Sequence, residues 1–141
     1  MRTDPDCIFC KIVAGEIPCQ KLLEDEAALS FLDIGPLAEG HALLIPTEHF
    51  VTLDEMPADT AAAVLGHLPA LTSAVREAVG AEGVNILQNN GKVAHQEVPH
   101  VHFHVIPRRT GDAFHFNWPA GQYPEGRIEP LAEAVRSKLP G

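Results

Sequence analysis

Five short stretches rich in apolar residues and separated by turn-forming or helical segments are predicted to be β-strands. Turn-forming residues separate the first three: Asp25 and Glu26 follow the first, and Gly35, Pro36 and Gly40 follow the second. Connections this short favour antiparallel neighbours. The predicted strands cover residues 20–24, 28–33, 41–46, 83–88 and 100–107.

Between the third and fourth strands, apolar residues recur at three- and four-residue spacing, which predicts an amphipathic helix over residues 57–79. Gly80 ends this helix, and Pro69 predicts a kink within it because proline lacks a backbone donor. Shorter helices are predicted over residues 7–13 and 130–139. The pattern indicates an α+β fold, a five-stranded antiparallel sheet backed by one long helix, with short N-terminal and C-terminal helices.

Length and composition favour one well-buried core. The chain has 141 residues, of which 45% are hydrophobic, so we expect a single domain over residues 1–141. Its core covers about residues 7–110, and residues 111–141 form an aromatic, proline- and glycine-rich tail and the last helix. No apolar run approaches the roughly 18 to 20 residues that span a bilayer, and residues 1–6 are polar, so we expect no membrane segment and a cytoplasmic location.

The net charge limits which classes of ligand the chain can bind, and the cysteine content indicates its redox compartment. A formal net charge of −9 opposes binding to nucleic acid or to an anionic membrane. A small anionic ligand could still bind if local hydrogen-bond donors held it. The three cysteines, Cys7, Cys10 and Cys19, are an odd number near one end, so they cannot form a disulfide framework for the whole chain. A reducing compartment fits this usage.

Three histidines alternate with apolar residues in the last predicted strand. In a strand, His100, His102 and His104 would line one face about 6 to 7 Å apart, and the apolar residues between them would anchor the other face to the core. Pro107 would end the strand. A solvated strand face is the alternative, since chance gives such a triplet in a few per cent of chains this rich in histidine.

Other polar residues could join these imidazoles. Asn89, Asn90 and Gly91 follow the fourth strand, and Gln96 and Glu97 precede the triplet. Amides and free backbone N–H groups beside imidazoles could cradle a phosphate without a large positive charge. Segments rich in Asn and Gly are otherwise simple turns, so the histidines are what favour a site here.

The triplet and several other segments resemble the histidine-triad (HIT) superfamily of nucleotide-binding proteins. The matching segments stand in family order: CIFCKIVAGEIP (7–18), FLDI (31–34), GHALLIPTEH (40–49), NNG (89–91) and QEVPHVHFHVIPR (96–108). The GEIP segment, the short chain and Trp118-Pro119 look most like the branch that hydrolyses nucleoside phosphoramidates. Dinucleoside polyphosphate hydrolysis, or a regulatory nucleotide-binding module with little turnover, are the alternatives.

The resemblance implies a role for each matching residue. His102 would attack the α-phosphorus of a purine nucleotide and form a nucleotidyl-histidine, and His104 would donate to the phosphate or the bridging atom. Asn89 and Gln96 would hold phosphate oxygens, with Glu97 contributing its backbone N–H. The remaining implied nucleotide contacts are His41 at the border of the site, Asp33 on the ribose, and Phe9, Phe31 and Ile34 around the base. For the aromatic residues the alternative is core packing.

The resemblance also implies a structural zinc and a homodimer. A lone CxxC is a weak signal, but some relatives bind a structural zinc through two cysteines and two histidines, one of them the first histidine of the triad. This sequence has all four, which implies a zinc site on Cys7, Cys10, His49 and His100 that fixes the triad strand, with no metal needed for the chemistry. A protein in which the triad only binds zinc is the competing interpretation. The family usually forms a two-fold dimer through the long helix and a strand, which would bring the aromatic tail near the partner's site.

Two positions depart from the family pattern. His95 stands where a small residue, usually glycine, precedes the glutamine. Glu97 stands where the phosphoramidase branch has serine, so we expect its carboxylate to point away from the phosphate. Arg108 and Arg109, beyond Pro107, are assigned no catalytic role.

Overall fold

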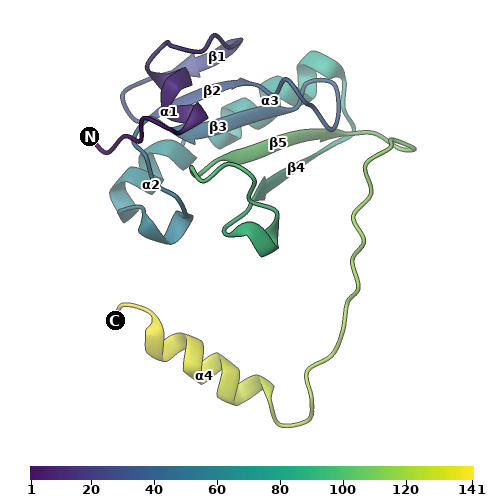
Figure 1. Ribbon diagram of the computed structural model, residues 1–141. Helices are drawn as coiled ribbons and strands as arrows, with labels where there is room; N and C mark the ends of the chain where they lie inside the picture. Colours follow the sequence, from purple (N-terminus) through teal and green to yellow (C-terminus); the bar gives the residue numbers. More distant parts are fainter.

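The computed structural model describes all 141 residues and contains one antiparallel sheet (Figure 1). The strands lie in the order β1-β2-β3-β5-β4, with every neighbouring pair antiparallel. Their bounds are β1 Lys21–Glu24, β2 Ala28–Leu32, β3 Ala42–Pro46, β4 Gly83–Gln88 and β5 Phe103–Arg108. The predicted five-stranded antiparallel sheet and α+β class are confirmed.

The last strand differs from its prediction at both ends. It begins at Phe103, so His100 and His102 precede it, because the N–H of Val101 donates to the carbonyl of Phe50 and not to a strand partner. It continues through Pro107, which pairs with Val84 of the edge strand β4. Pro107 therefore does not end the strand, since a missing donor is tolerated at a position without a ladder bond.

Four helices accompany the sheet: α1 Ile8–Val13, α2 Ala58–Leu65, α3 Leu68–Val79 and α4 Ile128–Lys138. The single helix predicted over residues 57–79 is wrong, because the chain breaks at Gly66 and His67. Pro69 thus lies in the first turn of α3, where its missing N–H costs no hydrogen bond, and it produces no internal kink. Gly80 ends α3 in the left-handed conformation, at φ 62°.

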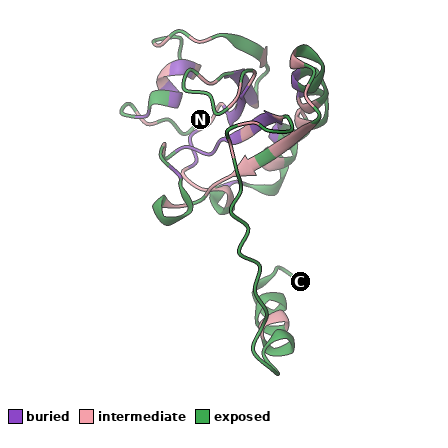
Figure 2. Ribbon diagram, turned by 90° about the vertical axis from the view of Figure 1, so that its right-hand side faces the viewer, coloured by how far each residue is buried: buried purple, intermediate pink, exposed green.

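Each face of the sheet buries its own apolar cluster. Helices α2 and α3 cover one face, and the apolar residues of the triad segment, Val101, Phe103 and Val105, are buried in that cluster. Helix α1 covers the other face with Phe9, Cys10 and further residues. Figure 2 shows this burial concentrated in the body of the molecule. The predicted alternation therefore holds, and the histidines face the α1 side.

Beyond β5 the chain leaves the body as an extended tail that ends in α4 (Figures 1 and 2). No helix of the protein is long and apolar enough to cross a membrane.

Candidate active site and metal centre

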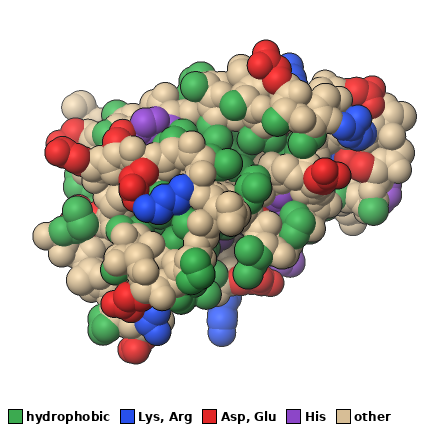
Figure 3. Space-filling model, turned by 90° about the horizontal axis from the view of Figure 1, so that it is seen from above, with side chains coloured by type: hydrophobic (Ala, Val, Ile, Leu, Met, Phe, Trp, Pro, Cys, Tyr) green, Lys and Arg blue, Asp and Glu red, His purple; other side chains and the backbone are tan.

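A cavity of about 730 Å³ opens on the α1 side of the sheet. Its floor carries His41, His102 and His104, and its walls are mostly apolar. Figure 3 shows histidine between hydrophobic side chains on the face seen from above. No lysine or arginine lines the cavity, and Asp33 and Glu97 are its only carboxylates.

His102 is held in one tautomer by the backbone. Its Nδ1 lies 2.7 Å from the carbonyl oxygen of His100, and a carbonyl can only accept, so Nδ1 carries the proton. The other ring nitrogen, Nε2, then keeps a free lone pair. Burial lowers the pKa of His102, which is 5% exposed, so the imidazole stays neutral at pH 7. A neutral ring with one bare nitrogen is equipped to act as a nucleophile.

His104 is fixed by a relay that begins at a backbone amide. The N–H of Leu37 donates to Nδ1 of His41 at 3.0 Å, so the proton of His41 must sit on Nε2. That Nε2 lies 2.9 Å from Nδ1 of His104 and donates to it. His104 therefore carries its own proton on Nε2, where it can be donated to a bound group. Desolvation lowers the pKa of His41 and, together with His102 and His41, lowers the pKa of His104 to about 4.

Aromatic residues of α1 and β2 wall the cavity. Phe9 packs edge-on against Phe31 at 5.7 Å and against His102 at 5.2 Å between ring centroids. Both phenylalanines belong to the buried cluster and line the cavity, so core packing and a pocket wall are compatible. Ile34 lies at the rim with its side chain fully exposed. Asp33 also lines the cavity, and its Oδ1 accepts from the N–H of Gly35 at 2.8 Å.

The loop between β4 and the triad is organised by Gln96. Its Oε1 accepts from the N–H of Gly91 at 2.7 Å, and its Nε2 donates to the carbonyls of Val51 and Val98 at 2.6 and 3.2 Å. The side chain is buried and does not line the cavity. Asn89, by contrast, lines the cavity. The geometry thus gives Gln96 a bracing role in the loop.

The two positions that depart from the family pattern both line the cavity. His95 is the one non-glycine residue with positive φ, at 68°, a conformation that glycine adopts without strain. Glu97 is exposed at the cavity and near enough to raise the pKa of His102, against the larger effect of burial.

Cys7, Cys10, His49 and His100 form a buried cluster behind the triad, with ligand atoms within 4.8 Å of one another. His100 Nδ1 lies 3.4 Å from the Sγ of Cys7, and His49 Nδ1 lies 3.3 Å from the Sγ of Cys10. Tetrahedral zinc, with bonds near 2.0 to 2.3 Å, separates its ligand atoms by about 3.3 to 3.8 Å. The sulfur–nitrogen separations therefore suit zinc, and the two Nδ1 atoms lie slightly closer together, at 3.1 Å.

Hydrogen bonding also prepares these histidines as ligands. His100 Nε2 lies 2.9 Å from the carbonyl of Pro46, to which it can only donate, so Nδ1 faces the cysteines without a proton. The outer nitrogen of His49 lies 3.9 Å from the carboxylate of Asp4. Burial raises the pKa of the Cys7 thiol, and a bound cation would favour its thiolate.

A second group, Asp33, His41 and His104, also places three ligand atoms within 4.8 Å. It does not fit a metal, because the Leu37 N–H forces the proton of His41 onto Nε2, the atom that would have to bind the ion. His41 and His104 are better described as a hydrogen-bonded pair, with Oδ2 of Asp33 3.7 Å from Nε2 of His41.

The sequence profile of the HIT domain matches residues 14–111, more than half of the chain. This protein belongs to the HIT family. An adenosine 5'-monophosphoramidase of Schizosaccharomyces pombe is 45% identical over 134 residues, which cover 94% of this chain and 98% of the relative.

Solved structures of HIT proteins agree with this assignment. The crystal structure of a HIT family protein from Bacillus anthracis matches with a TM-score of 0.92 at 35% identity, covering 98% of this chain and 100% of the other. A zinc-bound histidine-triad family protein from Mycobacterium smegmatis matches with a TM-score of 0.73 at 38% identity, covering 94% and 98%.

Several parts of this HIT site have no signal in the sequence. The backbone N–H of Leu37 and the carbonyl of Pro46 set histidine tautomers, but any residue could supply them. His115 and Asn117 of the tail also line the cavity. Their approach depends on Arg108, which no sequence pattern linked to the site.

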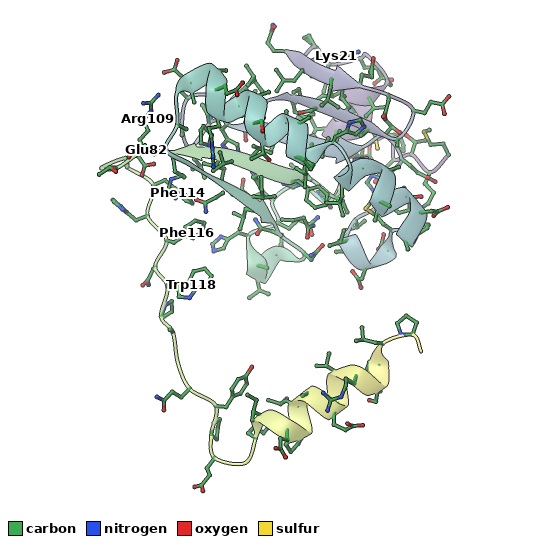
Figure 4. The ribbon with its side chains drawn as sticks, turned by 180° about the vertical axis from the view of Figure 1, so that it is seen from behind. Lys21, Glu82, Arg109, Phe114, Phe116 and Trp118 are labelled. Carbon is green, nitrogen blue, oxygen red and sulfur yellow. The ribbon has the colours of Figure 1, made fainter.

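Arg108 anchors the tail along the cavity wall. Its guanidinium donates to both carboxylate oxygens of Asp112 at 2.8 Å, to Asn85 at 2.7 Å and to the carbonyl of Phe114. It also lies over the Phe114 ring, 4.6 Å from the centroid. Figure 4 shows Phe114, Phe116 and Trp118 following one another along the tail.

Proposed function

We propose that this HIT protein hydrolyses nucleoside phosphoramidates of purine nucleotides through a nucleotidyl-histidine intermediate. The observation that carries the proposal is the pair of fixed tautomers, a bare Nε2 on His102 beside an Nε2–H on His104 in one cavity. This pair supplies a nucleophile and a hydrogen-bond donor to the reacting group without a metal.

In the proposed first step, Nε2 of His102 forms a bond to the α-phosphorus, and the phosphorus–nitrogen bond breaks. The leaving nitrogen takes a proton from a water molecule while the Nε2–H of His104 donates a hydrogen bond to it, so His104 stays neutral. In the second step the oxygen of the resulting hydroxide bonds to phosphorus and the bond from phosphorus to Nε2 of His102 breaks, which releases His102 and the nucleotide. The rigid carbonyl of His100 stabilises the positive charge on the His102 ring while the intermediate exists.

Several cavity residues would bind the nucleotide. Phe9 and Phe31 would form the wall for the base, with Ile34 at its rim. Oδ2 of Asp33, which lies 3.7 Å from Nε2 of His41, could accept from the ribose hydroxyls. Asn89 and backbone N–H groups near Glu97 would hold the phosphate, and Gln96 would shape that loop from behind.

The charge of the cavity favours an amine as the leaving group. A dinucleoside polyphosphate would leave a multiply charged anion in a cavity that has two carboxylates and no lysine or arginine. A phosphoramidate leaves a neutral or cationic amine, which needs no such counter-charge. We therefore place phosphoramidates ahead of dinucleoside polyphosphates.

The test is a pair of substitutions, His102→Ala and His102→Asn, assayed with adenosine phosphoramidate and diadenosine polyphosphate. We expect kcat/KM for the phosphoramidate to fall by a factor of about 10³ or more in both variants. His67→Asn, at an exposed pair with Asp25 remote from the cavity, is the matched control and should keep wild-type rates. Wild-type rates in both His102 variants would refute the enzyme assignment, and ligand binding without turnover in the wild type would favour a regulatory module.

We propose further that Cys7, Cys10, His49 and His100 bind a structural zinc ion. The zinc would brace His100, whose carbonyl orients His102. Metal analysis of protein purified without added zinc should give about one equivalent, reduced in Cys10→Ala, whereas Cys19→Ala, outside the cluster, should keep it. A content near zero in the wild type would exclude the proposal.

The remaining expectations concern the state of the protein in the cell. We propose a homodimer, supported by the unpaired edge of β4 and its exposed Ile86. We also propose a cytoplasmic location, since all three cysteines are free.

A further inference from the structure

Residues 2–6, which we call the latch, run past the cysteine cluster before the chain enters it at Cys7. Figure 1 shows this start of the chain passing the end of β3 on its way to α1. The latch belongs to no helix or strand, and contacts of Arg2 and Asp4 fix its place. The four cluster residues are buried and the latch is largely exposed, so it lies on the outer side of the cluster.

Arg2 contacts three consecutive residues centred on His49 of the cluster. Its N–H donates to Oε1 of Glu48 at 3.1 Å, its carbonyl accepts from the N–H of His49 at 2.8 Å, and its guanidinium lies 4.9 Å from the centroid of the Phe50 ring. An ion pair with Glu55 at 3.5 Å adds a fourth contact. His49 follows β3 outside any helix or strand, so without the Arg2 carbonyl its backbone N–H would have no partner in the protein.

Asp4 joins the latch to both sides of the cluster. Its carbonyl accepts from the N–H of Cys7 at 3.1 Å, and its Oδ1 accepts from the N–H of Asp6 at 2.8 Å. These bonds close a turn with Pro5 at the second position, where its fixed φ is favourable. Oδ2 of Asp4 lies 3.9 Å from Nε2 of His49. One oxygen of the carboxylate thus orders the approach to Cys7, and the other faces His49.

Of the two histidines in the cluster, His49 has less support of its own. The outer nitrogen of His100 lies 2.9 Å from the Pro46 carbonyl, and its ring is fully buried. The outer nitrogen of His49 has no direct acceptor, its side chain is 11% exposed, and the Asp4 carboxylate is the group that faces it. When Nδ1 binds an ion, the proton of the neutral ring lies on Nε2, where a carboxylate stabilises it and strengthens the ligand.

We propose that the latch holds His49 on the metal ion and slows release of the ion, with Asp4 as the positioning residue for the His49 ring. The inference rests on the zinc site proposed above and extends it to residues that do not touch the metal. Release begins with detachment of His49, because this ligand lies outside regular structure and its ring reaches solvent. The contacts of Arg2 and Asp4 oppose that detachment.

Transfer of zinc to an excess of a chelator whose absorbance changes on binding tests the latch in the full-length, zinc-loaded protein. Asp4→Asn keeps an oxygen for the N–H of Asp6 but turns a donor toward Nε2 of His49, so it should release zinc about tenfold faster or more. Asp6→Asn removes the same charge from a carboxylate without a hydrogen bond or ion pair, and should keep the wild-type rate. Arg2→Ala loses the ring and ion-pair contacts and should speed release by about two- to fivefold.

A second readout needs no metal. In the metal-free protein, alkylation by iodoacetamide followed by mass spectrometry reports how often the cluster opens. The double variant Arg2→Ala with Asp4→Ala should label Cys7 and Cys10 at least about threefold faster than the wild type. Cys19, which lies outside the cluster, is the internal control and should be labelled at an unchanged rate.

Three results would overturn the latch and leave the zinc site standing. They are release of zinc from Asp4→Asn at the wild-type rate, equal acceleration in Asp6→Asn, and unchanged alkylation of Cys7 and Cys10 in the double variant. A wild type that binds no zinc would refute the zinc site, and the latch with it. Hydrolysis is measured separately with the His102 variants, so its failure leaves the latch unaffected.

Discussion

Acid should destabilise this protein through His104, and replacing that residue should remove part of the effect. Burial and two neighbouring imidazoles lower the pKa of His104 from its ordinary 6.5 to about 4 in the folded protein. In the unfolded chain the residue protonates near pH 6.5. Between these values the unfolded state binds more protons, so stability is lost as the pH falls from 6.5 towards 4.

The size of the effect follows from the two pKa values. With an unfolded pKa of 6.5 and a folded pKa of about 4, linkage gives a loss of about 2 kcal/mol between pH 7.5 and pH 5. His104 is partly exposed, and solvent reduces the loss to between about 1 and 2 kcal/mol. This exceeds the error of a denaturant titration on a small domain.

The measurement is guanidinium unfolding of wild type and His104→Asn at pH 7.5 and pH 5, at one protein concentration and with chelator present. The wild type should lose about 1 to 2 kcal/mol more than the variant over this interval. His115→Asn removes an exposed imidazole of the tail and should keep the wild-type dependence. Equal pH dependence in wild type and His104→Asn would refute the assignment of a buried, neutral His104.

Three further predictions concern packing, backbone strain and catalysis. Leu44→Ala, at a fully buried position of β3, should lower the free energy of unfolding by about 3 kcal/mol in denaturant titration, whereas Leu22→Ala, which is 44% exposed, should cost under about 1 kcal/mol. Gly40→Ala should lower the Tm by several degrees, because a Cβ there would lie 2.8 Å from Cγ1 of Val79 and φ is +96°; an unchanged Tm would contradict the tight contact. Because burial lowers the pKa of His102 below 6.5, kcat/KM for a phosphoramidate should hold through pH 6.5 and fall only at lower pH, and a midpoint at or above 6.5 would contradict this.

The alternation of histidines and apolar residues correctly predicted which side of the sheet each residue of the triad segment faces, because the apolar residues must be buried. Val101, Phe103 and Val105 must enter the core under α2 and α3, so the histidines must face the other side. The strand boundary was less predictable. Where β5 begins depends on the carbonyl of Phe50, which binds Val101, and no local pattern encodes that contact.

The helix break and the contacts of Gln96 were not predicted from the sequence, for a different reason. Apolar spacing continues from α2 into α3, so periodicity alone predicts one helix, although Gly66 and Pro69 both favour a break where the structure has one. Gln96 was predicted from the resemblance to hold phosphate, and its place in the chain gives no hint that both ends of its amide are used inside the loop. Side-chain direction in irregular segments depends on partners that are distant in sequence.

His100 connects the cysteine cluster with His102 in the cavity. This connection explains why neighbouring histidines of one segment have different environments. Its side chain belongs to the cysteine cluster, with Nε2 on the Pro46 carbonyl, while its own carbonyl oxygen fixes the proton of His102. The His100 ring is fully buried and held at both nitrogens, which restrains the backbone unit that bears this carbonyl. Bracing the cysteine cluster therefore helps to hold His102, the proposed nucleophile, in its tautomer without any contact between the cluster and the substrate. The cluster can thus support catalysis from behind the strand and leave the cavity itself free of fixed positive charge.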